Sequence, residues 1–322
     1  MNVGYFCTYI PEEIISSCHV HPKFLNPGSV SHNHTAPYLP TAFCPFAKSL
    51  LTDLLNDDGN DIDFFLFGGG CDAGKKLYDL FPSLRPNVPC HYLEVPLANT
   101  EYALEYYAHS LNQLAQKLLS FQGNSPLDFA DHLNQSLELS YHRKKNRSEA
   151  FAAGELSGDL LINNTVPSEK NPKTNLAQNI PILFIASHLF IQPIISTLEQ
   201  KGFLVYDNSA LGMRRYIFPG IDYSPKIDAL MTLSRWYLMN KVPCPGHSSD
   251  RRLTILQQTI SGLNLQGVIY FYPKFCDQSL YDLAFLNQHL RIPILAIEHD
   301  TSFSSLGQWE TRIDAFWEVL SK

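Results

Sequence analysis

The chain has 322 residues, of which 45% are apolar and 17% are charged, so it can form one large globular domain or two ordinary ones. Its 31 acidic and 24 basic residues give a net charge of −7, which argues against nucleic-acid binding and against attraction to an anionic membrane. No run of about eighteen uncharged apolar residues is present, so the sequence predicts no transmembrane helix.

The first residues, Met1 to Glu13, lack a basic leader followed by a long apolar core. We therefore expect no secretory signal and a cytoplasmic location. The seven cysteines are an odd number, and in a reducing compartment they favour free thiols, metal ligands or catalysis over a disulfide framework. A short basic stretch, His142 to Arg147, is interpreted as a solvated helix face or loop.

The first half of the chain alternates short apolar runs with stretches of helical periodicity. We expect strands at Val3–Thr8, Asp61–Phe67 and Cys90–Val95. Helices are expected from Pro11, over Ala47–Asn56, over Thr100–Phe121, and onward to about Leu161. The segment from Asn26 to Pro40 is rich in Pro, His, Ser and Asn, and this composition predicts a loop.

The polar segment Asn163–Asn179 carries two prolines and is the best candidate for a linker. Beyond it we expect strands at Ile182–Ala186, Phe203–Tyr206, Val268–Tyr272 and Ile294–Ile297, and helices at Ile191–Gln200, Lys226–Met239, Arg251–Ile260, Ser279–His289 and Gln308–Leu320. Strands with helices between them form parallel sheets covered on both faces. The sequence therefore predicts two Rossmann- or flavodoxin-like α/β domains with additional helices: an N-terminal domain with a helical extension over residues 1–162, a linker over 163–179, and a C-terminal domain over 180–322.

Gly69 to Lys75 fits the pattern G-x-x-x-x-G-K, which suggests a phosphate-binding loop. A working loop of this type needs Ser or Thr next, to bind magnesium, and this chain has Lys76. We therefore do not interpret the segment as an ATP site. Its glycines instead allow a tight turn that presents Cys71.

Three cysteines lie just before expected helices. Cys44 follows a loop, whereas Cys71 and Cys276 each follow an expected strand. A helix N-terminus stabilises a thiolate, and thiolates bind soft metal centres. Because binding sites in parallel sheets form at the carboxyl ends of strands, these three cysteines are the candidate metal ligands. From spacing alone, the alternative of buried structural cysteines stays open, since no C-x-x-C pair is present.

The sequence gives less support for the other cysteines as metal ligands. Cys7, Cys18 and Cys90 are interpreted as small buried apolar residues, and Cys244, in the loop VPCPGH, is a second-tier candidate. Four histidines near the N-terminus suggest a zinc site, but none has the spacing of a helical metal pair, so we interpret them as loop and surface residues.

Two carboxylates, Glu298 and Asp300, end the last expected strand and are predicted to face the same sheet edge as the cysteines. They are candidates for an acid–base role or for hydrogen bonding near the site. The alternative is that they are helix-capping or loop carboxylates.

An ordered set of segments carries a family resemblance across nearly the whole chain. The segments are GYFCTYIPEEII, FCPFAKSLL, GGGCD, YLEVP, FLVYDNSALGMRRYI, DRRLTIL, GVIYFYPKFCD and IPILAIEHD. The chain resembles a subunit of the 2-hydroxyacyl-CoA dehydratase and benzoyl-CoA reductase family, which includes double-cubane cluster proteins. The resemblance implies α/β domains and an oxygen-sensitive 4Fe–4S cluster at their seam, with Cys44, Cys71 and Cys276 as its ligands.

The same resemblance implies a low-potential, one-electron reduction. A separate iron–sulfur activator would hydrolyse ATP and deliver the electron, and a dimer with a homologous or identical chain would act on an acyl-CoA. Three thiolate ligands would leave one iron open to another ligand. Two alternatives stay open: a double-cubane protein that reduces small molecules, and an electron-transfer or accessory protein without its own substrate.

Overall fold

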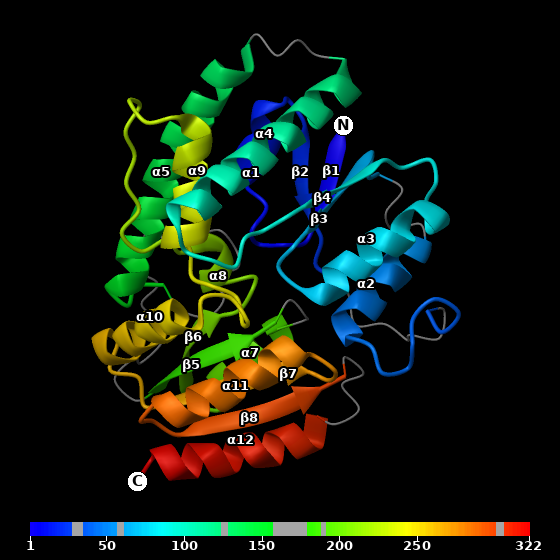
Figure 1. Cartoon of the computed structure of the whole chain (residues 1–322). Coiled ribbons are helices and arrows are strands. Elements are labelled where there is room, and N and C mark those ends of the chain that lie inside the picture. The colour runs from blue at the N-terminus through cyan, green and yellow to red at the C-terminus, as the bar shows by residue number, and fades with distance from the viewer. Residues whose placement is uncertain (28–34, 57–60, 124–127, 157–178, 188–190, 301–305) are drawn as a thin grey trace. The chain divides into compact units, whose positions relative to one another are not determined.

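The computed structural model describes residues 1–27, 35–56, 61–123, 128–156, 179–187, 191–300 and 306–322 (Figure 1). The chain divides into two compact units. The first comprises Met1–Asn26, Leu50–Asn146 and Phe218–Lys241, and the second comprises Pro27–Ser49, Arg147–Ile217 and Val242–Lys322. Each unit contains one sheet of four parallel strands, which confirms the predicted α/β class with two parallel-sheet domains.

Residues 163–178 of the predicted linker lie outside the described residues, so the predicted domain boundaries stay a prediction. A single boundary near the linker does not describe the two compact units. Pro27–Ser49, which contains Cys44, belongs to the second unit, and Phe218–Lys241, far along the sequence, belongs to the first.

The first sheet has the order β2-β1-β3-β4. Its strands are β1 (Asn2–Tyr5), β2 (His21–Phe24), β3 (Phe64–Gly68) and β4 (Cys90–Leu93). The helices that carry residues of this unit are α1 (Glu12–Ser17), α2 (Pro45–Leu55), α3 (Asp72–Leu84), α4 (Glu101–Gln122), α5 (Phe129–Ala152), α9 (Ala229–Arg235) and the π-helix η4 (Trp236–Asn240).

The centre of the first unit is aromatic. Every residue of β3 is buried, as expected for an inner strand of a parallel sheet. The ring of Phe65 lies 4.5 Å from that of Phe67 and 5.0 Å from that of Phe81 on α3. This packing fixes α3 against the strand that precedes it, and with it the turn between them.

The second sheet has the order β6-β5-β7-β8. Its strands are β5 (Ile180–Ala186), β6 (Phe203–Asn208), β7 (Gly267–Pro273) and β8 (Ile294–His299). The helices are α7 (Ile191–Gln200), α8 (Met213–Tyr216), α10 (Ser249–Gly262), α11 (Asp277–His289) and α12 (Leu306–Leu320). Aliphatic residues of β5, β7, α10 and α11 share one buried core, while α12 packs along β8 (Figure 1).

Several elements differ from the sequence-based expectation. The first strand ends at Tyr5 rather than Thr8, because Cys7 to Ile10 form a turn closed by a bond from Ile10 N–H to the Cys7 carbonyl at 3.0 Å. Strand β2 was not predicted, since HPKF lacks an apolar pattern. The helix expected over 226–239 begins later, where the Asp228 side chain accepts a bond from Met231 N–H, and it ends as the π-helix η4.

Gly212, in the turn after β6, provides a test of local packing. A Cβ at this position would lie 2.3 Å from Asp207 Oδ2, and that carboxylate is fully buried. Gly212→Ala should therefore destabilise the protein by about 1–3 kcal/mol in urea unfolding, because the turn must shift. Gly307→Ala in α12, where a Cβ would meet nothing within 4 Å, is the matched control and should be neutral or slightly stabilising. Equal stability of the two variants would contradict the packing described for this turn.

Candidate functional site

The turn between β3 and α3 presents Cys71. Its backbone is extended, with φ −161° and ψ 158°, and it is the N-cap residue of α3 without a capping bond from its side chain. A Cβ on Gly68 would lie 2.4 Å from Cys7 Cβ, so only glycine allows this close approach of two strand ends. The half-buried Cys71 thiol thus stands at the positive end of the α3 dipole.

The turn between β7 and α11 presents Cys276 in the same way. Lys274 N–H bonds the His299 carbonyl at 2.8 Å, which ties this turn to the end of β8. Phe275 then adopts φ +60°, a left-handed conformation that is unusual for a bulky residue. Cys276 follows as the N-cap of α11, and its Sγ lies 3.1 Å from Ser279 Oγ.

Cys44 immediately precedes α2. Its carbonyl accepts the bond from Lys48 N–H at 3.1 Å, which makes it the N-cap of that helix, and Pro45 occupies the first helical position. The Lys48 ammonium bonds the Thr41 carbonyl at 2.5 Å and so fixes the loop that enters the helix. The thiol of Cys44 is half-buried.

All three cysteines predicted as ligands are therefore N-cap residues with partly accessible thiols. Cysteine sulfurs are the donors that iron–sulfur centres use, so the donor set fits such a cofactor. Cys71 belongs to the first unit, and Cys44 and Cys276 belong to the second. Among the residues that the structure describes, no three His, Cys, Asp or Glu side chains form a group that could hold a metal ion.

Comparison with known proteins relates these features to a family. The sequence model described as "2-hydroxyglutaryl-CoA dehydratase, D-component" matches residues 7–161 and 155–320. The chain belongs to this family. The family recognised from the ordered motifs, and the expectation of an enzyme of dehydratase or reductase type, are confirmed.

Three relatives of this dehydratase family are similar over most of their length. The dehydratase subunit YjiM of Escherichia coli K12 is 34% identical, with 99% of this chain and 91% of the relative covered. The beta subunit of (R)-phenyllactyl-CoA dehydratase from Clostridium sporogenes is 20% identical, with 99% and 91% covered. A benzoyl-CoA reductase subunit from Thauera aromatica is 21% identical, with 87% and 80% covered.

The remaining cysteines differ in their surroundings. Cys18 is fully buried, and burial raises the pKa of its thiol to about 12, as expected for a structural residue. Cys90 is half-buried at the start of β4, and desolvation raises the pKa of its thiol. Cys7 is buried but lies in the turn after β1, where its Sγ is 3.0 Å from the position that a Cβ on Gly70 would take. Sequence reasoning missed that Cys7 touches the glycine turn of this family member.

The two carboxylates predicted at the end of β8 have different settings. Glu298 is exposed, whereas Asp300 is half-buried with its Oδ2 3.5 Å from Lys274 Nζ. The buried residue between them, His299, was not predicted to matter. Its ring stacks on Phe271 at 4.1 Å, burial lowers its pKa to about 3, and its Nε2 has no hydrogen-bond partner within the described part of the chain.

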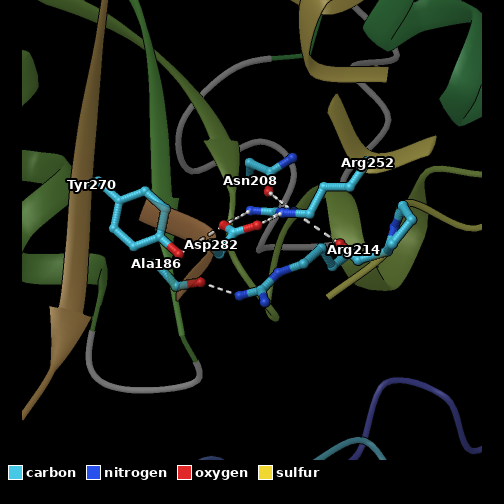
Figure 2. A network of polar contacts seen from close by, with 7 residues as sticks. Ala186, Asn208, Arg214, Arg252, Tyr270 and Asp282 are labelled. Atoms are coloured by element: carbon cyan, nitrogen blue, oxygen red, sulfur yellow. Dashed lines mark hydrogen bonds and ion pairs between the residues drawn. The ribbon is translucent and has the colours of Figure 1, made fainter. Parts of the chain in front are cut away.

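A buried arginine organises the carboxyl edge of the second sheet (Figure 2). The guanidinium of Arg252 donates to both oxygens of Asp282, at 2.8 and 3.0 Å, and to the carbonyl of Pro243 at 2.8 Å. The Tyr270 hydroxyl donates to the same carboxylate at 2.8 Å. Arg252 on α10 is thus bound to Asp282 on α11, the helix that Cys276 caps, and to the loop that contains Cys244. Tyr270 adds β7 to the same group of contacts.

A corresponding group lies in the first unit. Glu13, in the first turn of α1, is buried, with Lys144 Nζ 3.2 Å from its Oε1 and the Tyr237 hydroxyl donating to its Oε2 at 3.0 Å. The Lys144 ammonium also lies 4.1 Å from the centre of the Phe218 ring. The interpretation of the basic stretch as a solvated face is therefore wrong for Lys144, which neutralises a buried carboxylate.

The charge pair of Arg252 and Asp282 gives a prediction for stability. Arg252→Met or Asp282→Asn should each cost about 3–5 kcal/mol of unfolding free energy, because each leaves a buried charge without its partner. The double variant should lose less than the sum of the two. Lys23→Met, which breaks the exposed pair with Asp61 at 2.6 Å, is the control and should change stability far less. Additive losses in the double variant would show that the two side chains are not coupled.

Asp207, at the end of β6, gives a prediction for pH dependence. Burial raises the pKa of its carboxyl to about 6, although Ser209 and Arg214 oppose the shift. The folded protein therefore holds this proton more tightly than the unfolded chain, and stability falls as the pH rises from about 4 to about 6. The side chain that Asp207→Asn introduces cannot ionise. As the pH rises from about 4 to about 6, the free energy of unfolding of this variant should therefore rise, relative to that of the parent, by up to about 3 kcal/mol. A difference that stays constant with pH in urea unfolding would refute this assignment.

Proposed function

We propose that the chain is the iron–sulfur subunit of an ATP-activator-dependent reductive enzyme of the 2-hydroxyacyl-CoA dehydratase or acyl-CoA reductase type. In this proposal, Cys44, Cys71 and Cys276 hold one 4Fe–4S cluster. The observation that carries it is that each of these cysteines is the N-cap of a helix in a member of this dehydratase family. The donors are of the type that soft iron centres require.

When bound, such a cluster supplies low-potential one-electron transfer, and three protein thiolates leave one iron position free for another ligand. The chain itself contributes the positioning. The glycine turn brings Cys71 to the head of α3, and the buried contacts of Arg252 orient α11 behind Cys276. These groups would keep the thiols in place while an electron arrives from outside.

Acid–base chemistry is assigned in this proposal to the end of β8. Asp300, with Lys274 beside it, has the setting of a group that can give or take a proton, since both side chains are partly accessible. Glu298 is exposed on the same strand end and is the second candidate. The neutral ring of His299 lies between them and contributes a buried surface rather than a charge.

The relatives are named as subunits, and we propose that this chain likewise works with a homologous subunit or with a second copy of itself. ATP would be consumed by a separate iron–sulfur activator, and the substrate would be an acyl-CoA. The reaction would take place without oxygen in a reducing cytoplasm. Among the described residues, no helix has the length and apolar run needed to cross a bilayer.

Iron analysis of anaerobically purified protein tests the cluster. About four irons per chain are expected, with the absorption and spin-resonance signals of a 4Fe–4S centre. Cys44→Ser, Cys71→Ser and Cys276→Ser should each lose most of the iron, because serine oxygen is a poor ligand for iron–sulfur centres. Cys90→Ser is the matched control and should keep it. An iron-free anaerobic protein, or equal iron in all four variants, would rule out the proposed ligand set.

A further inference from the structure

A pocket of about 360 Å³ opens in the first unit, at the carboxyl ends of β3 and β4, and the proposed cluster chemistry does not use it. Its walls are Gly69 in the glycine turn, Lys75 on α3, Tyr92 and Glu94 at the end of β4, and Tyr106 on α4. A Cβ on Gly69 would lie 3.1 Å from the Tyr92 hydroxyl and 2.9 Å from the backbone nitrogen of Val95. Glycine at this position therefore keeps the pocket open.

One side of the pocket carries a positioned cation. The Lys75 ammonium lies 4.7 Å from the centre of the Tyr92 ring and 4.9 Å from that of Tyr78. Its other neighbour is Asp79, 3.4 Å away, and both side chains of that pair are about half exposed. Because exposed ion pairs are weak, the ammonium can exchange this contact for an anion in the pocket.

The other side carries an acceptor. The carboxylate of Glu94 accepts a bond from the Tyr106 hydroxyl. A carboxylate has about four acceptor positions, so it can also receive hydroxyl groups of a ligand. Tyr92 also lines the pocket, and its phenol can donate a hydrogen bond to a ligand.

The pocket lies in a β3-α3-β4 unit of two parallel strands joined by a helix, which is the arrangement that dinucleotide-binding folds use. Gly68 ends the buried strand and Gly74 lies in the helix that follows it, and a Cβ on Gly74 would lie 3.0 Å from the Gly68 carbonyl, so glycine here allows close packing of helix on strand. Glu94 directly follows the neighbouring parallel strand, twenty residues after Gly74. In dinucleotide-binding folds, an acidic residue at this place and spacing binds ribose hydroxyls.

We infer that this pocket binds the ribose and the adjoining phosphates of an adenosine 5′-diphosphate group. Glu94 accepts the ribose hydroxyls, Lys75 pairs with a phosphate, and the two tyrosines form the walls. The site is distinct from a magnesium-dependent phosphate loop: α3 already begins at Asp72, and Gly69 N–H is used by the Leu93 carbonyl at 2.9 Å. Binding at this pocket does not require the proposed cluster, because none of the lining residues is one of its ligands. The assignment of the group to CoA, rather than to a free adenine nucleotide, rests on the proposed function.

Calorimetric titration of the full-length, anaerobically purified protein tests the site, with iron measured in the same sample so that loss of the cluster is read separately. The probes are ADP, CoA and pantetheine, which lacks the nucleotide. ADP and CoA should bind, and pantetheine should not. Tighter binding of CoA identifies an acyl-CoA as the source of the group, and tighter binding of ADP identifies a free nucleotide; both support the inference.

Matched variants locate the binding. Lys75→Met and Glu94→Gln should each weaken ADP binding by about tenfold or more, because each removes a charged partner of the ligand. Lys76→Met on α3 and Glu105→Gln on α4 change exposed residues outside the pocket lining and should bind ADP as the parent does. Absence of ADP binding to the parent, or equal affinity of the Lys75 and Lys76 variants, would overturn the inference.

Discussion

Parallel hydrogen bonding between strands is the constraint on which each unit depends. A strand can reach a parallel neighbour only through a crossover, so each inner strand is followed by a turn and a helix, and these turns share one edge of the sheet. In the first unit this brings the Cys7 turn against the glycines before Cys71. In the second unit it joins the turn before Cys276 to the end of β8.

Buried charged groups then fix the helices that adjoin these turns. Asp282 in the second unit (Figure 2) and Glu13 in the first are both buried, and each carboxylate has a cationic partner and accepts a hydrogen bond from a tyrosine hydroxyl. Such groups are costly to bury, and they are tolerated because their partners satisfy them. Removal of either partner alone would leave a buried charge unpaired, so each pair ties together helices that are far apart in the sequence.

The sequence predicted what is local and missed what depends on distant partners. Apolar strands, and the helices that Cys71 and Cys276 precede, are read from short patterns, so their positions agree with the structure. The end of β1 is set by a turn, so Cys7 was placed in a strand it does not belong to. His299 stacks on Phe271 of another strand, and Lys144 pairs with Glu13 near the N-terminus. Neither contact can be predicted from a local sequence pattern.

Because Phe218–Lys241 belongs to the first unit, the chain cannot be cut between its two halves without removing part of that unit. A fragment that ended at the polar segment near residue 163 would lack α9 and η4, and with them the hydroxyl of Tyr237 that Glu13 needs. The complementary fragment would carry a piece of a fold that it cannot complete. Neither half of the chain, divided near residue 163, is therefore expected to fold alone as its unit does in the whole protein.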